Sequence, residues 1–237
     1  MNHFFYSSDI FDEFIIIGGD EAHHAIKVLR KKEGDIIFVV DGLGGVYETI
    51  IENAAIDDCK LKIMNKKKNY HKPDHYIHIA ICPTKSHDRL EWFIEKSVEL
   101  GIQEISFLKT QRTERDNVKI NRIVKRSISS MKQSLKAYLP IINDMVDFNY
   151  FIKNCTNNHK YIGHLNHENT RMLSHVAPAG KNYCVMIGPE GDFTDKEILD
   201  AKDNEFDCIL LNQARLRTET AGLAACQILN IINQNEF

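Results

Sequence analysis

Short apolar runs separated by glycine and aspartate dominate the first seventy residues. Each run has the length and the β-branched content of a strand. The expected strands are residues 14–19, 35–42, 45–52 and 59–64. Between the first two, residues 21–31 carry apolar side chains at helical spacing, and Asp20 stands where it could cap this short helix. The pattern predicts a small, mostly antiparallel sheet or barrel.

Beyond residue 73 the pattern changes to strands that alternate with helices. The expected strands are residues 76–82, 104–108, 160–165, 183–187 and 208–211. The expected helices are residues 88–100 after Ser86, residues 117–138, a helix after the capping box at 194–197, and one from about Thr218. Such alternation predicts an α/β domain with a mostly parallel sheet and helices on both faces.

A lysine-rich stretch separates these two patterns. It contains Lys60, Lys62, Lys66, Lys67, Lys68 and Lys72, and Pro73 follows. A change of composition at a charged, proline-containing segment is typical of a domain boundary. We therefore expect one domain over residues 1–72 and a second over residues 73–237.

Composition changes this picture little. The 237 residues are 43% hydrophobic and 27% charged, which excludes collagen, coiled-coil and wholly disordered classes. With 30 basic and 33 acidic residues the formal net charge is −3, which excludes a uniformly basic nucleic-acid-binding protein.

The cysteines and the N-terminus indicate a cell compartment. No two of the six cysteines form a Cys-x-x-Cys pair, and several lie within apolar runs, so we expect buried free thiols in a reducing compartment. The first residues lack the basic start of a signal peptide, and no apolar run has the length of a membrane span. We expect a cytoplasmic protein with no membrane association.

Two loops that leave expected strands and enter expected helices are the candidate site. They cover residues 188–193 and 212–217 and carry Glu190 and Arg217, and Glu219 follows the second loop. Ligands of α/β sheets bind where such loops gather, at the carboxyl ends of the strands. The alternative interpretation is two ordinary strand-to-helix turns. The sequence contains no dinucleotide or Walker fingerprint and no spacing of histidine and cysteine typical of a metal site, so we expect no metal.

Basic residues form three clusters despite the negative net charge. The first spans residues 23–32, the second is the lysine-rich boundary, and the third spans residues 109–136. Each cluster taken alone could be a solvated surface. Together they suit contacts to a phosphate backbone. The candidate residues for such contacts are His23, His24, Lys27, Arg30, Arg112, Arg122 and Arg126.

Five segments occur in an order and spacing that resemble a known family. They are HHAIKVLR (23–30), IEKSVELG (94–101), KQSLKAYLP (132–140), IGPEGDF (187–193) and LRTETAGLAA (216–225). The chain resembles the RsmE-type 16S rRNA (uracil-N3)-methyltransferases of the SPOUT superfamily over nearly its whole length. The resemblance implies an N-terminal PUA-like RNA-binding β-barrel and a C-terminal SPOUT domain with a deep trefoil knot. It also implies a homodimer that uses S-adenosyl-L-methionine to methylate N3 of one uridine in the small ribosomal subunit.

The resemblance also implies roles for individual residues. The implied cofactor neighbours are Leu165, His167, Ile187, Gly188, Glu190, Gly191, Leu211, Asn212, Leu216, Arg217 and Thr218. Uracil N3 must lose a proton before it can accept a methyl group, and Arg217 could stabilise the resulting charge on the uracil carbonyls. Glu190 and Glu219 are weaker candidates for the base, and each could instead hold loop amides.

Several positions depart from the family pattern. Asp192 stands where a second glycine is usual, Asn212 replaces a glycine, and Ala214 and Arg215 replace an arginine and a branched apolar residue. Lys132 and Lys136 stand where an acidic residue and an arginine are common. Two alternatives remain open: a methyltransferase acting on another RNA, and a non-catalytic RNA-binding factor of ribosome assembly.

Overall fold

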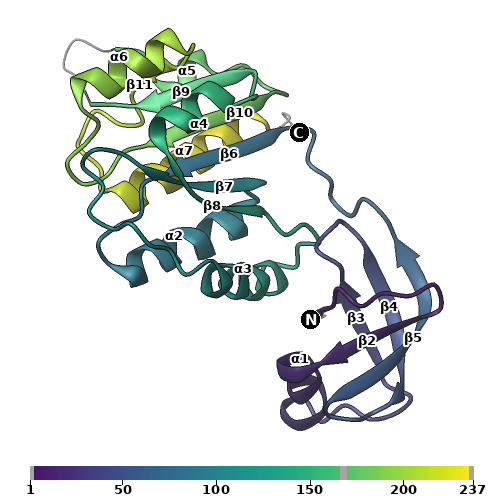
Figure 1. Ribbon diagram of the computed structural model, residues 1–237. Helices are drawn as coiled ribbons and strands as arrows, with labels where there is room; N and C mark the ends of the chain where they lie inside the picture. Colours follow the sequence, from purple (N-terminus) through teal and green to yellow (C-terminus); the bar gives the residue numbers. More distant parts are fainter. Residues whose placement is uncertain (1–2, 166–169, 235–237) are drawn as a thin grey trace. The chain divides into compact units, whose positions relative to one another are not determined.

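The computed structural model describes residues 3–165 and 170–234. The chain forms two compact units (Figure 1). The first comprises residues 1–72 and 128–139, and the second comprises residues 73–127 and 140–237. Residues 128–139, which the sequence assigns to the C-terminal domain, therefore belong to the first unit.

The first unit is built on a five-stranded sheet in the order β1-β3-β4-β5-β2. Its strands are β1 (Phe4–Tyr6), β2 (Phe14–Gly18), β3 (Ile36–Val40), β4 (Val46–Asn53) and β5 (Asp58–Lys67). The pairing is antiparallel except between β1 and β3, which confirms the expected mostly antiparallel sheet. The residues after β1 reach β2, since Ser7 Oγ donates to Ile16 O (2.6 Å) and Ile16 N donates to Asp9 O (3.1 Å). These two bonds curl the sheet toward closure.

The expected capping of the N-terminal helix by Asp20 is wrong. Helix α1 (Gly19–His23) begins after Gly18, and Asp20 lies inside its first turn, where a carboxylate favours the helix dipole without capping it. A π-helical turn, η1 (His24–Val28), continues the segment. Ala22 and Ala25 pack into the core of the sheet together with Phe5 and Leu61.

The long helix expected over residues 117–138 is shorter. Helix α3 (Ile120–Gln133) ends before Leu135, whose φ of +53° no helix can accommodate. The chain then pairs with the first unit, where Gly44 N donates to Ala137 O (2.9 Å) and Leu139 N donates to Gly42 O (2.8 Å). Tertiary pairing thus overrides the apolar periodicity over residues 134–138.

The second unit contains a six-stranded sheet in the order β11-β9-β10-β6-β7-β8, in which every pair is parallel. The prediction of an α/β fold with a parallel sheet is confirmed. The strands are β6 (Tyr76–Ile81), β7 (Glu104–Lys109), β8 (Ile141–Asp147), β9 (His159–Gly163), β10 (Asn182–Ile187) and β11 (Asp207–Ile209). Strand β8 escaped prediction because it lies at the edge of the sheet and buries none of its residues fully.

Helices cover both faces of this sheet (Figure 1). They are α2 (His87–Leu100), α4 (Phe148–Asn154), α5 (Leu173–Val176), α6 (Asp195–Asp203) and α7 (Thr218–Ile232). Helices α4 and α6 share one core with Ala80, Cys184 and Met186, whereas α2 and α7 pack together on the opposite face. The capping box at Thr194 is confirmed, and α2 ends at Gly101, which has the left-handed backbone common at helix C-termini.

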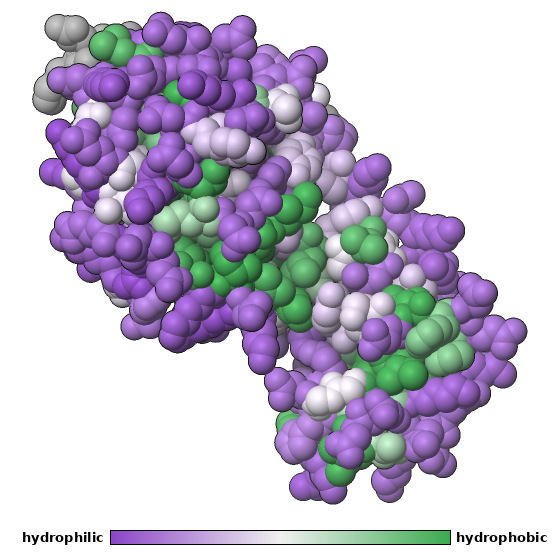
Figure 2. Space-filling model, viewed as in Figure 1, coloured by the Kyte–Doolittle hydropathy of each residue, from purple (hydrophilic) through white to green (hydrophobic). Residues whose placement is uncertain are grey.

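Several other expectations have outcomes here. All six cysteines are free thiols; Cys59, Cys82, Cys184 and Cys226 are buried, and Cys155 and Cys208 are half-buried. Among residues 3–165 and 170–234, none of the helices combines the length and apolar character that crossing a bilayer requires. Hydrophilic residues cover most of the face in Figure 2, with hydrophobic areas exposed in each unit. The trefoil knot stays a prediction.

Gly222 allows α7 to lie close to the sheet. A Cβ at this position would come within 2.7 Å of the Phe93 ring and 3.0 Å of Ile81 Cδ1. Alanine in place of a helical glycine normally stabilises a helix by about 1 kcal/mol. Forcing an extra methyl group into a filled core costs about 1–3 kcal/mol. The close approach of α7 therefore depends on the missing side chain.

We expect Gly222→Ala to lower the free energy of unfolding, because the clash outweighs the gain in helix propensity. Urea denaturation would measure this loss. In a double-mutant cycle, Phe93→Leu should cost less in the Gly222→Ala background than in the unaltered chain, since it relieves the clash. A stabilised Gly222→Ala variant would contradict the expectation.

Candidate active site

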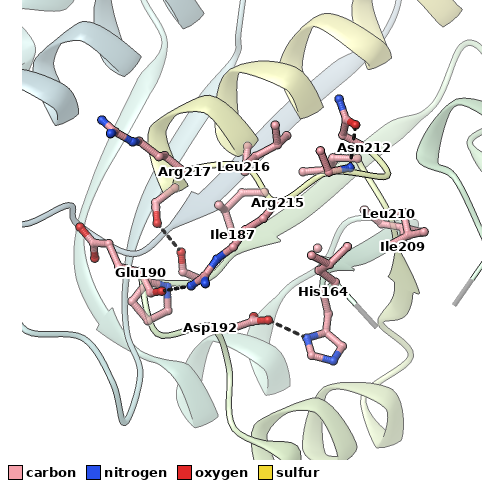
Figure 3. Close-up of a pocket in the computed structure, with 18 residues that line it drawn as sticks. His164, Ile187, Glu190, Asp192, Ile209, Leu210, Asn212, Arg215, Leu216 and Arg217 are labelled. Atoms are coloured by element: carbon pink, nitrogen blue, oxygen red, sulfur yellow. Dashed lines mark hydrogen bonds and ion pairs between the residues drawn. The ribbon is translucent and has the colours of Figure 1, made fainter. Parts of the chain in front are cut away.

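A cavity of about 630 Å³ lies where three neighbouring strands end. Strands β9, β10 and β11 are adjacent and parallel, so the loops that follow them meet at one edge of the sheet. The lining residues are Gly163, His164, Leu165, Ile187, Gly188, Pro189, Glu190, Asp192, Ile209, Leu210, Leu211, Asn212, Ala214, Arg215, Leu216, Arg217, Thr218 and Ala221 (Figure 3).

Two hydrogen bonds tie the loop after β10 to the loop before α7. The buried Thr218 Oγ1 donates to Gly188 O (3.0 Å), and Arg215 Nη2 donates to Glu190 O (2.9 Å). Gly188 packs against Phe193, since a Cβ on it would come within 3.0 Å of the ring. Side chains of one loop thereby fix the carbonyl groups of the other, and the cavity wall is held before any ligand arrives.

A polar pair lies on the wall of the cavity. His164 Nδ1 and Asp192 Oδ2 are 3.0 Å apart and point toward one another (Figure 3). Asp192 has a left-handed backbone with φ of +61°, and its Oδ1 accepts from Phe193 N (2.7 Å). The departure from glycine at this position is thus compensated by two hydrogen bonds of the new carboxylate.

Nine of the eleven expected cofactor neighbours line this cavity. They are Leu165, Ile187, Gly188, Glu190, Leu211, Asn212, Leu216, Arg217 and Thr218. Gly191 does not line it; its carbonyl instead accepts from Arg112 Nη1 (2.7 Å). His167 lies outside the described residues. The grouping follows from strand order, which brings together loops far apart in the sequence.

The three catalytic candidates have different surroundings. Arg217 is exposed, its side chain points outward from the other labelled lining residues, and it forms no side-chain hydrogen bond or ion pair within the described residues (Figure 3). Glu190 uses its Oε1 to accept from Lys85 N (3.1 Å), and so holds a loop amide. Glu219 is buried, faces Arg89 Nε at 3.6 Å, and is not among the lining residues.

The basic candidates divide into paired and unpaired groups. Arg122 and Arg126 both contact the buried Glu91, and Arg126 also contacts Glu95. Burial raises the pKa of Glu91, but hydrogen bonds from Arg126 and Arg122 outweigh this and lower it. The charges of these two arginines are therefore largely compensated within the second unit.

The other basic candidates lie in the first unit, apart from Arg112. His23, Lys27 and Arg30 are exposed and His24 is half-buried. None of these four forms an ion pair among the residues that the structure describes. Arg112 bonds to the carbonyls of Gly191 and Phe193 and so supports the cavity loop.

Sequence reasoning missed several lining residues, including His164, and placed Arg215 in the candidate loop without giving it a role. His164 directly follows β9, and its N donates to Ile209 O (3.1 Å) on the neighbouring strand. Reading the residue that follows each buried strand as a site candidate would have found His164. Beneath the cavity, burial raises the pKa of Cys82 to about 12, which keeps this thiol protonated and unreactive.

No group of three or more histidine, cysteine or acidic side chains suited to a metal ion occurs within the described ranges. What the cavity offers instead is a mixture of apolar side chains, fixed backbone groups and one unpaired guanidinium at its rim. Such a lining suits a mainly apolar ligand with a few polar groups beside an anionic or developing-anion partner.

Two known domain families match the chain. The family described as RNA methyltransferase domain matches residues 71–230, which include the cavity. The family described as RNA methyltransferase PUA domain matches residues 17–64, within the curled sheet.

Relatives match over almost the whole length. Ribosomal RNA small subunit methyltransferase E of Rickettsia conorii is 27% identical over 225 residues, 93% of this chain and 91% of the relative. The crystal structure of a probable rRNA-methyltransferase from Porphyromonas gingivalis has a TM-score of 0.91 at 34% identity and covers 98% of both chains. A ribosomal RNA small subunit methyltransferase E from Neisseria gonorrhoeae, bound to S-adenosyl methionine, has a TM-score of 0.85 at 22% identity and covers 98% of both.

We expect Thr218→Val to loosen the cavity wall, because it removes the bond to Gly188 O and leaves that buried carbonyl unpaired. The free energy of unfolding should fall by about 1–3 kcal/mol. Calorimetric titration should show weaker binding of the ligand that fills the cavity. Thr220→Val is the control, since Thr220 is exposed and lies two residues further along α7. Equal losses in both variants would contradict a specific role for Thr218.

Proposed function

Because this chain belongs to the RNA methyltransferase family and is of the RsmE type, with a PUA domain before its catalytic domain, we propose that it methylates N3 of one uridine in 16S rRNA. It is an S-adenosylmethionine-dependent small-subunit rRNA methyltransferase with a SPOUT-type catalytic domain. The observation that carries the proposal is the cavity at the ends of β9, β10 and β11, inside the matched domain.

The lining fits S-adenosylmethionine in chemical terms. Leu165, Ile187, Leu211 and Leu216 offer apolar surface for an adenine ring, while Asp192 and the fixed loop carbonyls suit cationic and hydroxyl groups. The volume of about 630 Å³ is within the usual range for a cofactor of this size. The bound cofactor supplies an electrophilic methyl group on a sulfonium. The residues of this chain supply alignment, which is a large part of the rate of such a transfer.

We assign to Arg217 the contact with the uracil ring that is methylated. When N3 of uracil loses its proton, negative charge spreads onto the two neighbouring carbonyl oxygens. An unpaired guanidinium at the rim can stabilise this charge, and a donor placed in this way is worth about 2.7–4 kcal/mol of barrier. Glu190 and Glu219 already hold a loop amide and Arg89, respectively, and we assign neither of them as the base.

We assign the contacts to the RNA phosphate backbone, which we call the RNA track, to the first unit and not to α3. Lys27 and Arg30 offer exposed charge, and His23 an exposed imidazole, with no acidic partner among the described residues, whereas Arg122 and Arg126 share the carboxylate of Glu91. The proposed 16S rRNA substrate supports a location in the cytoplasm, where small subunits are assembled.

We further propose that the chain acts as a homodimer formed by its catalytic domain. Trp92 on α2 and Ile231 on α7 are 43% and 55% exposed, and these two helices pack side by side. A second copy could bury both apolar side chains. Light scattering on the purified chain tests this, and a monomer at micromolar concentration would exclude it.

The function is tested with small ribosomal subunits from cells that lack the enzyme. Incubation with labelled S-adenosylmethionine, followed by mass spectrometry of the digested rRNA, should yield one new 3-methyluridine. A ribose-methylated nucleoside, or label only on another RNA, would favour a different substrate. Cofactor binding without any methyl transfer would favour the non-catalytic assembly factor.

Arg217→Ala should lower kcat by about 10²–10³-fold with little change in cofactor affinity, since it removes one donor to the developing charge. Arg217→Lys, which keeps the positive charge, should recover part of this loss. Single-turnover kinetics and calorimetry on the same preparations give the two readouts. Full turnover with unchanged cofactor affinity in Arg217→Ala would refute the assignment.

Arg30 and Arg122 should differ in the salt dependence of RNA binding. If Arg30 contacts a phosphate, Arg30→Ala should reduce the slope of log K against log salt by about 0.7–0.9. Arg122→Ala should leave the slope unchanged, and should lower stability because Glu91 loses one of its two arginine partners. The slope is measured by fluorescence anisotropy at several salt concentrations. A reduced slope in Arg122→Ala alone would reverse our assignment of the track.

A further inference from the structure

A second cavity lies on the first unit. Its volume is about 230 Å³, and it is lined by Phe4, Phe38, Val46, Glu48, Asn65, Lys67, Tyr70 and Leu135. All eight residues belong to this unit, since residues 128–139 complete it. The cavity is therefore a property of the PUA-containing unit alone.

Four of these residues form one row across the sheet. Phe4 on β1 lies opposite Phe38 on β3, Phe38 lies opposite Glu48 on β4, and Glu48 lies opposite Asn65 on β5. Residues paired in register project from the same face. The adjacent residues Phe5, Val39 and Tyr47 are buried in the core, so the row projects from the other, outer face. The outer face thus presents two aromatic rings followed by a carboxylate and an amide.

Tyr70 forms a side wall of the cavity and is held there by its backbone. Asn69 and His71, on either side of it, have left-handed φ angles of +53° and +49°. Two such residues on either side of one aromatic residue are uncommon, and such strain concentrates at functional positions. Tyr70 N donates to Gly44 O (3.0 Å), and its ring meets the Phe4 ring edge-on with 6.3 Å between centroids.

The polar groups of the cavity differ in what they can bind. The carboxylate of Glu48 only accepts hydrogen bonds, and it has no ion-pair partner among the described residues. Asn65 Oδ1 accepts from Lys66 N (2.8 Å), so its NH₂ group remains to donate. Lys67 adds an ammonium donor. An acceptor beside donors matches a base that carries both an amino group and a carbonyl group; guanine and cytosine have both, whereas adenine lacks the carbonyl and uracil lacks the amino group.

The surroundings carry the charge that a nucleotide backbone requires. Lys66, Lys67 and Lys68 are consecutive and exposed at the end of β5. Lys66 Nζ lies 4.7 Å from the centroid of the Tyr47 ring, and neither Lys67 nor Lys68 forms an ion pair within the described residues. A stacking surface beside unpaired lysines is the usual composition of a single-stranded nucleic-acid site.

We propose that this cavity binds one unpaired base of the RNA, guanine or cytosine, at a position other than the uridine that is methylated. The base stacks against the Phe4 and Phe38 side of the cavity, Glu48 accepts from its amino group, and Asn65 or Lys67 donates to its carbonyl. The inference rests on the proposed function, since it assumes an RNA substrate. It adds a site that selects the RNA by sequence as well as by charge.

The test uses the full chain and short single-stranded RNAs made of uridine with one central guanine, cytosine or uridine. Fluorescence anisotropy at fixed salt gives each affinity. The RNAs that contain guanine or cytosine should bind more tightly than the all-uridine RNA. Phe38→Ala or Tyr70→Ala should weaken binding of the guanine RNA by about 5- to 150-fold, which is the effect expected for loss of one stacked base.

Glu48→Gln isolates the recognition step from stacking. This change keeps the size of the side chain and should reduce the preference for guanine over uridine by about tenfold. The all-uridine RNA should bind equally well or better, because a negative charge has gone. Glu33→Gln is the matched control, since Glu33 is exposed and outside the cavity. Met64→Ala controls for the loss of apolar surface in the aromatic variants, because Met64 is exposed on β5 beside Asn65 and does not line the cavity.

Three results would overturn the proposal. They are equal affinity for all three RNAs, an unchanged preference in Glu48→Gln, and aromatic variants that alter the oligomeric state in light scattering but not RNA affinity. The last result would indicate that a protein surface occupies the cavity. Thermal melts identify aromatic variants that fail to fold. If they do fail, the base preference of Glu48→Gln is the result that tests the proposal. Failure here with intact methylation of small subunits would leave the proposed function standing, whereas base preference without methylation would overturn the function alone.

Discussion

The site depends on the parallel alignment of β11, β9 and β10, which end side by side. Loops separated by more than forty residues meet at that edge only because every pair in the sheet is parallel. Close packing then fixes them: α7 lies against β6 because Gly222 has no side chain, and its first residue, Thr218, reaches Gly188 O. The cavity is thus rigid as a result of packing, and its polar atoms are oriented by neighbouring loops before a ligand arrives.

Charge is used in two different ways in the two units. In the second unit, arginines serve mainly as internal ties: Arg112 binds loop carbonyls, and Arg122 and Arg126 surround the buried Glu91. Arg217 differs from these arginines, because its guanidinium forms no side-chain hydrogen bond or ion pair within the described residues. In the first unit, Lys27, Arg30 and the lysines at the end of β5 have no acidic partner among the residues described. Counting positive residues in the sequence could not separate these uses, because the carboxylates that cancel them lie about thirty residues away.

Much of the fold could be predicted from the sequence, for identifiable reasons. The buried strands and α7 have strong apolar patterns, and the Thr194 capping box and Gly101 are local signals that tertiary contacts did not override. Strand β8 lacks such a pattern because it lies at an edge, and the end of α3 was misplaced because residues 134–138 pair with residues 42–44 of the first unit. The pairing of His164 with Asp192 also needed the strand order, since 28 residues separate them.

Residues 128–139 belong to the first unit although they follow part of the second in the sequence, and this affects how the chain folds during its synthesis. The chain completes most of the first unit by residue 72, leaves it for the second, and returns only to lay Ala137 and Leu139 against Gly44 and Gly42. During translation, the N-terminal sheet therefore stays open along this border until residue 139 has left the ribosome. Leu135 also lines the aromatic cavity, so that cavity is incomplete on a nascent chain. Neither unit is a continuous piece of sequence. A gene fragment ending at residue 72 would encode the sheet of the first unit without residues 128–139, which complete that unit.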